Sequence, residues 1–132
     1  MFDKQRLLVV DDSTEITNLI GEIAETAGFD VHTLNDSSFF FKEFDDLRPD
    51  LVCIDIHMPD VDGIEILRWL SGRGTSVGVI ILSGGDPLFS KVAERIGEAA
   101  KLCVQTVEKP FRIEDLRAVL GTMAAHQHAG TA

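Results

Sequence analysis

Five polar side chains stand out because each one ends or directly follows a short apolar run. Asp11 and Asp12 follow the first run, and Asp55 follows the third. Ser83 closes the fourth run, and Lys109 follows the fifth. Each residue alone is weak evidence, because polar residues commonly stand where strands give way to loops. Brought together, however, they would place three carboxylates, a hydroxyl and an ammonium group at one site.

Such a set supports a specific chemistry. Three clustered carboxylates repel one another unless a cation lies among them, and oxygen ligands suit Mg²⁺. A carboxylate can act as the nucleophile that accepts a phosphoryl group, which gives an acyl phosphate. Negative charge on the transferred group calls for cations and donors, which Lys109, Ser83 and the backbone N–H of Gly84 can supply. The sequence therefore predicts a magnesium-dependent phosphoryl acceptor, provided that the fold brings these residues together.

The elements that must position these residues alternate between two hydrophobic periods. Continuous apolar runs predict buried strands, which cover residues 7–10, 31–34, 51–54, 77–82 and 103–107. Apolar residues spaced by three and four predict helices, which span residues 16–27, 40–47, 63–70, 87–96 and about 113–120. Five such units predict a doubly wound α/β fold with a five-stranded parallel sheet and helices on both faces. Ligands of such sheets bind beyond the carboxyl ends of the strands, where the five polar residues fall.

Several residues predict where these helices begin and end. Ser13 or Thr14 can cap the first helix, and Gly28 can end it. Pro49 stops the second helix, and Asp86 followed by proline offers an N-cap for the fourth. These signals agree with the periodicity, so the helix assignments rest on two independent features.

Composition and charge limit the class of protein. The 132 residues are 45% hydrophobic and 26% charged, which suits one globular domain and argues against wholesale disorder. No apolar run approaches about 18 residues and no signal-peptide pattern is present, so we expect a cytoplasmic chain without a membrane span. The net charge of −10 disfavours direct binding to nucleic acid or to anionic membranes. Cys53 and Cys103 form no CxxC pair, and Cys53 is expected to be a core residue.

The polar residues lie in segments that resemble the bacterial response-regulator receiver domain of two-component signalling. The matching segments are LLVVDDS at 7–13, PDLVCIDIHMPDVDG at 49–63, VIILSGG at 79–85 and VEKPF at 107–111. The resemblance, which is chemotaxis-regulator-like, implies the flavodoxin-like (βα)5 receiver fold. We assign residues 1–123 to the receiver, or phospho-acceptor, domain and expect residues 124–132 to form a flexible C-terminal tail.

The resemblance also implies a role for each acidic residue. Asp55 would be the phospho-acceptor. Asp12 and Asp55, together with the backbone carbonyl of His57, would bind Mg²⁺, and Asp11 would bind it directly or through water.

The remaining site residues would act on the phosphoryl group. Lys109 would pair with its oxygens, Ser83 would be the switching hydroxyl, and the backbone of Gly84 would contact a phosphoryl oxygen. Members of the family catalyse only their own phosphorylation and dephosphorylation. The donor is a phosphohistidine of a sensor kinase or a phosphotransfer protein, and phosphorylation switches contacts with a downstream protein target or a fused effector domain.

Two positions depart from the family pattern. Thr106 stands where the family has an aromatic residue, which puts in doubt the usual coupling between the hydroxyl and a rotating ring. The simpler interpretation is that threonine fills a smaller space. His57 follows Asp55 by two residues, so its side chain should point toward the site mouth and affect hydrolysis of the acyl phosphate. Alternatively, His57 is an exposed polar residue of which the backbone alone matters.

Two further clusters have mainly structural interpretations. Phe40 and Phe44 share a helical face and are expected in the core, whereas Phe39 and Phe41 cannot both join them, so at least one should be exposed. His126 and the histidine two residues later have an HxH spacing, to which we assign no metal.

Other functions are open to a chain of this kind. An aspartate-nucleophile phosphatase would carry DxDx[TV] after its first strand, where this chain has DDST, and no nucleotide-binding glycine loop is present. A phosphorylation-independent scaffold would fit worse, since all five acceptor-site residues are intact. About a dozen residues follow the last predicted helix in the given sequence, so we expect no effector domain within it. The chain is therefore either a stand-alone receiver or an excised receiver of a longer regulator, such as a cyclic-dinucleotide phosphodiesterase, which the segment LCVQTVEKPF resembles.

Overall fold

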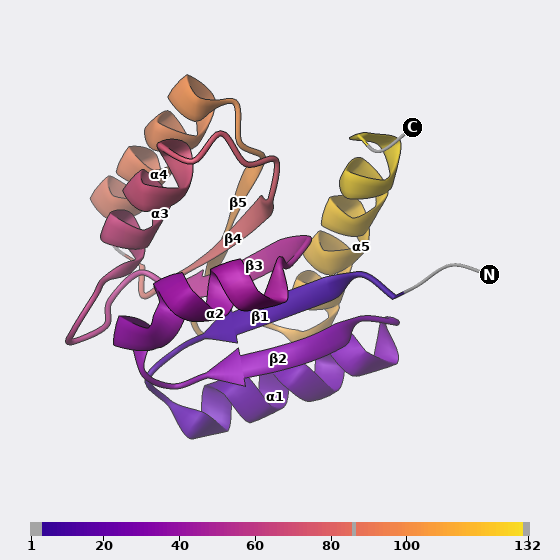
Figure 1. Ribbon diagram of the computed structural model, residues 1–132. Helices are drawn as coiled ribbons and strands as arrows, with labels where there is room; N and C mark the ends of the chain where they lie inside the picture. Colours follow the sequence, from indigo (N-terminus) through magenta and orange to yellow (C-terminus); the bar gives the residue numbers. More distant parts are fainter. Residues whose placement is uncertain (1–3, 86, 131–132) are drawn as a thin grey trace.

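A single five-stranded parallel sheet forms the centre of the molecule (Figure 1). The computed structural model describes residues 4–85 and 87–130, the last three by their backbone only. The strands lie in the order β2-β1-β3-β4-β5. Their bounds are β1 Arg6–Val10, β2 Asp30–Leu34, β3 Leu51–Asp55, β4 Gly78–Ser83 and β5 Val104–Glu108. The predicted doubly wound α/β architecture is confirmed, with strand ends within one residue of the expected ones.

Helices cover both faces of the sheet (Figure 1). Their bounds are α1 Thr14–Thr26, a 3-10 turn η1 Ser37–Phe39, α2 Phe40–Leu47, α3 Gly63–Ser71, α4 Pro87–Ala100 and α5 Ile113–Gly130. One apolar cluster joins the sheet to α2, α3 and α4, and a second joins the opposite face to α1 and α5. Because β3 and β4 are covered on both sides, all of their residues are buried. That explains their unbroken apolar sequence.

Local capping interactions set the helix boundaries. The Ser13 hydroxyl accepts a hydrogen bond from the Ile16 N–H at the start of α1, and Gly28 follows this helix with a positive φ of 96°. The Asp62 carboxylate accepts from the Glu65 N–H at the start of α3. These partners satisfy backbone groups that the helices leave open. Asp86, the expected cap of α4, lies outside the described residues.

The phenylalanine-rich segment divides between core and surface as predicted. Phe40 and Phe44 are buried, while Phe39 is 59% exposed. Phe41 is half-buried and contacts Trp69 of α3 in an edge-to-face arrangement, with the ring centroids 5.0 Å apart. This aromatic cluster therefore joins α2 to α3.

The last helix is longer than expected. We expected a helix ending near Leu120, but α5 continues to Gly130. Two long-range hydrogen bonds fix the additional turns: the Gln5 side chain donates to the Ala124 carbonyl, and the Gln127 side chain donates to the Ser76 carbonyl. Residues 124–130 are therefore helical, where the sequence indicated a tail. Their apolar periodicity is weak, and contacts with residues that precede β1 and β4 hold them in the helix instead. Within the described ranges, no helix is long and apolar enough to cross a bilayer.

A glycine sets the distance between α4 and β5. A Cβ atom on Gly97 would lie 2.4 Å from Cγ2 and 3.1 Å from Cβ of Val104. Valine is stiff about χ1, so its side chain cannot turn away cheaply. The close packing of α4 on β5 therefore requires glycine at position 97.

We predict opposite effects for two helical glycine substitutions. Gly97→Ala should lower the free energy of unfolding by about 1–3 kcal/mol because of the clash with Val104. Gly121→Ala, at an exposed position of α5, meets nothing within 4 Å and should raise this free energy by about 0.5–1 kcal/mol. Urea denaturation of both variants checks this. Equal effects of the two substitutions would contradict the packing argument.

Candidate phosphoryl-acceptor site

The strand order brings the predicted polar residues to one edge of the sheet. Asp11 follows β1 and Asp55 ends β3, and these two strands are neighbours. Ser83 ends β4, and its register partner is Glu108, the residue before Lys109. The carboxyl ends of four strands therefore supply the site, as expected for an open parallel sheet.

The three carboxylates form one cluster. Carboxylate oxygens of Asp11, Asp12 and Asp55 all lie within 4.8 Å of one another. Asp11 and Asp55 are buried, whereas Asp12 is exposed. Among the residues that the structure describes, the Asp12 carboxylate has no hydrogen-bond or ion-pair partner. A mixed set of buried and open carboxylate oxygens fits a hard divalent cation that retains part of its water shell.

Lys109 reaches across the sheet edge to two of these acids. Its Nζ lies 2.8 Å from Asp11 Oδ2 and 3.4 Å from Asp55 Oδ2. Because β4 stands between β3 and β5, the lysine must extend past the end of a strand to make these contacts. A long, flexible cationic side chain suits that position.

Burial and mutual charge alter the acid–base behaviour of the site. Burial raises the pKa of Asp55 above its ordinary value, and the negative charge of Asp11 raises it further, which outweighs the opposing effect of Lys109. Burial alone would lower the pKa of Lys109. The hydrogen bond to Asp11 and the charges of Asp55 and Asp11 outweigh burial, so this pKa lies above its ordinary value. Lys109 therefore stays positively charged, whereas burial and the charge of Asp11 disfavour the ionised form of Asp55.

Hydrogen bonds orient Asp11 from both sides. The Ser13 N–H donates to Asp11 Oδ1 over 2.9 Å. The Asn35 amide donates to the Asp11 carbonyl over 2.9 Å and to the Thr17 hydroxyl over 3.0 Å. The spacing of Asn35 in the sequence gives no signal for this supporting role.

The loop after Asp55 is held by close backbone contacts. The His57 N–H donates to Asp55 Oδ1 over 3.2 Å, and the Gly63 N–H donates to the Ile56 carbonyl over 3.1 Å. A Cβ on Gly63 would lie 2.8 Å from the Ile56 Cα and 2.9 Å from the Asp55 carbonyl oxygen. The Ser37 hydroxyl accepts from the Val61 N–H over 2.9 Å. Gly63 and Ser37 thus support the acidic site without contributing ligands.

Ser83 and Gly84 continue the site from the end of β4. Ser83 is buried, and the Gly85 N–H lies 3.4 Å from its hydroxyl oxygen. Gly84 is exposed, and a Cβ there would meet nothing within 4 Å. The protein itself therefore does not require glycine at position 84. Any such requirement must come from a group bound beside it.

His57 and Thr106 lie at the border between the acidic site and α4. The exposed His57 ring contacts Phe89 of α4 edge to face, with the centroids 4.8 Å apart. It is the His57 backbone, rather than its ring, that hydrogen-bonds to Asp55. Thr106 on β5 lines a hollow of about 260 Å³, together with Glu94 and Glu98 of α4. The position that holds an aromatic residue in the family is therefore beside open space on the α4 side in this protein.

Replacing the central acid should stabilise the cation-free protein. Asp55→Asn removes the like-charge interaction with Asp11 and should raise the free energy of unfolding at neutral pH, on the order of 1 kcal/mol. Because the fold raises the pKa of Asp55, its ionised form destabilises the native state above the ordinary value of 3.8. The advantage of the variant should therefore shrink as the pH falls through that range. Denaturation in EDTA, with exposed Asp46→Asn as the matched control, measures this. A variant less stable than wild type at pH 7 would contradict it.

Comparisons with known proteins agree with this geometry. The family model of the response regulator receiver domain matches residues 7–121. The transcriptional regulatory protein TrcR of Mycobacterium tuberculosis is 33% identical over 115 residues, which are 87% of this chain and 43% of TrcR. The chain likewise spans 37% of the Bacillus subtilis regulator PhoP, so it covers less than half of either relative.

Solved structures share the fold. The crystal structure of full-length FixJ from B. japonicum matches with a TM-score of 0.85 and 25% identity, over 98% of this chain and 62% of FixJ. The signal receiver domain of an HD domain-containing protein from Pseudomonas fluorescens Pf-5 has the same TM-score at 23% identity, over 96% of this chain and 99% of that one. Strand order, acidic cluster and family match lead to one conclusion: this chain belongs to the response regulator receiver domain family of two-component signalling.

Proposed function

We propose that the chain accepts a phosphoryl group on Asp55, in the presence of Mg²⁺, and thereby switches its protein contacts. One observation carries this proposal: the clustered oxygens of Asp11, Asp12 and Asp55 lie beside an ammonium group that is 3.4 Å from Asp55. Such a site combines a nucleophile, cation ligands and a fixed positive charge. The chain acts as a signalling domain, and its only catalysis is on itself.

In the proposed reaction, an Asp55 carboxylate oxygen attacks the phosphorus of a phosphohistidine. The new O–P bond forms as the N–P bond breaks, and the imidazole leaves. Asp11, Asp12, Asp55 and the His57 carbonyl would hold Mg²⁺, which supplies positive charge to the phosphoryl oxygens when bound. Water later hydrolyses the acyl phosphate and restores the carboxylate.

The remaining residues would stabilise the phosphorylated state. Lys109, already within 3.4 Å of Asp55, would pair with a phosphoryl oxygen. The Ser83 hydroxyl would donate to another oxygen, and the open space at Gly84 would let its N–H approach a third. These interactions are made only when the group is present, so they can drive a change in the end of β4 and the start of α4.

An apolar hollow beside Lys109 suits the docking of the phosphodonor. Ile16 and Leu19 of α1, with Pro110 and Phe111, line it, and its volume is about 360 Å³. Leu19 is 37% exposed, although apolar. A sensor kinase or phosphotransfer protein that covers this hollow would bring its histidine to the acidic site. The output partner would be a downstream protein or a fused effector domain, in the cytoplasm, with no direct contact to nucleic acid or membrane.

Intact-mass measurement tests the acceptor role. Incubation with Mg²⁺ and acetyl phosphate should add about 80 Da to the wild type and nothing to Asp55→Asn. Exposed Asp46→Asn, as the matched control, should be modified like the wild type. Because fast hydrolysis could hide the adduct, beryllofluoride with Mg²⁺ should also raise the melting temperature of the wild type. If the wild type shows no adduct and no melting shift, the proposal is contradicted and a scaffold role is favoured.

The His57 side chain should affect the lifetime of the phosphorylated state. Its exposed ring lies against Phe89, and we expect it to restrict the access of water to Asp55. His57→Ala should therefore shorten the lifetime by a factor of about 3, roughly 0.7 kcal/mol. Phe89→Ala should act in the same direction, while exposed Lys91→Ala on the same helix should not. The decay of phosphorylated protein after removal of the donor measures this. An unchanged lifetime in His57→Ala would show that only the His57 backbone matters.

A further inference from the structure

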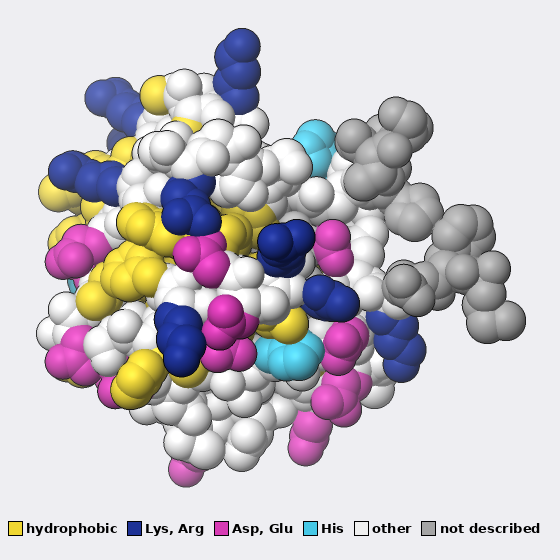
Figure 2. Space-filling view, in the orientation of Figure 1, with side chains coloured by type: hydrophobic (Ala, Val, Ile, Leu, Met, Phe, Trp, Pro, Cys, Tyr) yellow, Lys and Arg dark blue, Asp and Glu magenta, His cyan; other side chains and the backbone are white. Residues whose placement is uncertain are grey.

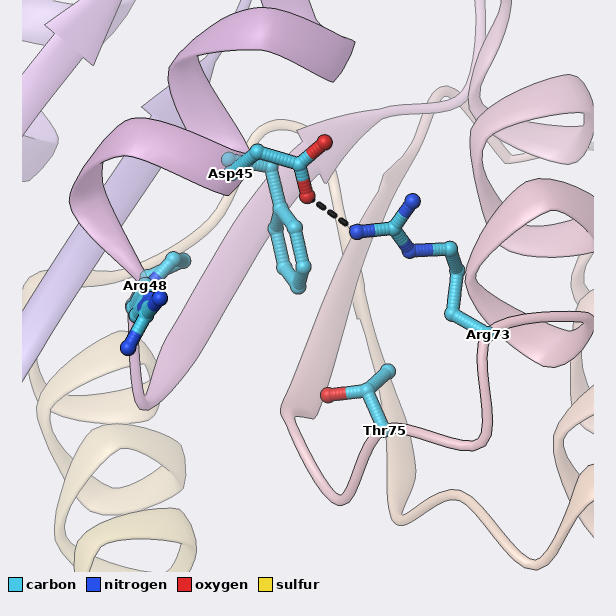
Figure 3. A pocket seen from close by; sticks show the side chains of 6 residues that line it. Asp45, Arg48, Arg73 and Thr75 are labelled. Carbon is cyan, nitrogen blue, oxygen red and sulfur yellow. Dashed lines mark hydrogen bonds and ion pairs between the residues drawn. The ribbon is translucent and has the colours of Figure 1, made fainter.

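A third hollow, shown in Figure 3, lies at the opposite end of the sheet from the acidic site. Its lining comes from the end of α2, the turn into β3 and the loop into β4: Phe44, Asp45, Arg48, Pro49, Arg73 and Thr75. These residues precede β3 and β4, whereas the acidic site follows them, so a strand length of roughly 15 Å separates the two. The hollow has a volume of about 500 Å³, within the range of small-molecule sites.

Arg73 is held in place before any ligand arrives. Its guanidinium forms an ion pair with Asp45, which Figure 3 shows spanning the hollow from α2 to the loop after α3. The same group lies over the Trp69 ring, 4.4 Å from its centroid. An arginine has five N–H donors, and the Asp45 contact leaves others free. A planar cation fixed by stacking and pairing loses little entropy when it binds an anion.

Arg48 supplies a second cation to the lining of the hollow. Its side chain is exposed and makes no hydrogen bond or ion pair with any residue that the structure describes. Its backbone has a φ of 52°, the left-handed region that favours glycine or asparagine at a helix end. The turn is fixed around it: the Arg6 guanidinium donates to the Leu47 carbonyl, and the Asp50 carboxylate accepts from the Arg6 N–H, each over 2.8 Å. The fixed turn therefore holds the Arg48 backbone at the edge of the hollow, while its exposed side chain can reach a ligand.

The other walls define the kind of ligand. Thr75 Oγ1 accepts from the Val77 N–H, which leaves its hydroxyl hydrogen free to donate. Buried Phe44 and Pro49 add apolar surface. Figure 2 shows Lys and Arg side chains interspersed with Asp and Glu across the face that carries α2. The two arginines outnumber the single acid of the lining, so the hollow favours an anion over a cation.

We propose that this distal hollow binds a small molecule with one oxyanion group, a phosphate monoester or a carboxylate, attached to an apolar body. Arg73 and the Thr75 hydroxyl would hold the oxyanion, and the exposed side chain of Arg48 would reach it from the opposite wall. Phe44 with Pro49 would pack against the apolar body. Such a site would let a metabolite act on a signalling domain from the end remote from Asp55. The argument is independent of phosphorylation at that residue.

Phenyl phosphate is the probe, because it combines a phosphate monoester with a flat apolar ring. The titration is followed by amide and arginine side-chain NMR of Asp55→Asn protein in EDTA, which prevents phosphorylation and removes divalent cations. We expect saturable shifts at Arg48, Arg73 and Thr75, and none from phenol. Shifts confined to residues 11–13, 55–57 and 83–85 would place binding at the acidic site instead. That result, or no shift at millimolar phenyl phosphate, would overturn the proposal.

Two variants separate binding from folding. Arg48→Gly should weaken phenyl phosphate about tenfold, the typical loss for a charged hydrogen-bonding partner. It should also raise the melting temperature, because glycine relieves the left-handed backbone. Arg73→Ala should weaken binding similarly. Arg68→Ala removes the same charge from exposed α3 outside the lining and should change the affinity less than twofold. Full affinity in Arg48→Gly and Arg73→Ala would contradict the assignment.

Discussion

Two buried carboxylates, Asp11 and Asp55, lie side by side in this molecule, and Lys109 is what makes their burial tolerable. Its Nζ lies 2.8 Å from the first and 3.4 Å from the second. Burying an uncompensated charge is costly, and burying two like charges together is worse. The lysine compensates only in part, since the pKa of Asp55 stays raised. A bound cation would relieve the remaining negative charge. Together with Lys109, it would supply the positive charge that a phosphoryl group on Asp55 requires.

The strand order and the loop contacts of the fold hold these charged residues in place. Parallel strands place Asp11, Asp55, Ser83 and Lys109 on one edge, and the order β1-β3-β4-β5 sets their separation. Contacts outside the site then fix its loops: Asn35 holds the end of β1, and Gly63 with Ser37 holds the segment after Asp55. On the α4 side, a hollow lies beside Thr106, and the ring of His57 contacts Phe89. The loop after Asp55 therefore touches α4, so a charge change at Asp55 takes place next to that helix.

The sequence predicted what depends on periodicity and on strand ends. Continuous apolar runs located β3 and β4, because both strands are buried on two faces. The aspartates at the ends of the first and third runs located the acidic cluster. The sequence could not locate features made by distant contacts. The last turns of α5 depend on Gln5 and Gln127 meeting the far end of the sheet, and the ring of His57 is placed by Phe89. The distal hollow likewise joins two loops that are about 25 residues apart in the sequence, and no local pattern marks it.

The most direct test of the central claim is the free energy of unfolding as a function of Mg²⁺ concentration at neutral pH. If the carboxylate cluster is an unsatisfied cation site, the free energy of unfolding of the wild type should rise with the logarithm of the Mg²⁺ concentration once that concentration exceeds the dissociation constant. At a Mg²⁺ concentration a hundred times the dissociation constant, the gain should be about 2.7 kcal/mol. Asp55→Asn should gain much less, because it has already lost the charge that the cation would neutralise. A wild-type stability independent of Mg²⁺, or an equal gain in both proteins, would contradict the account.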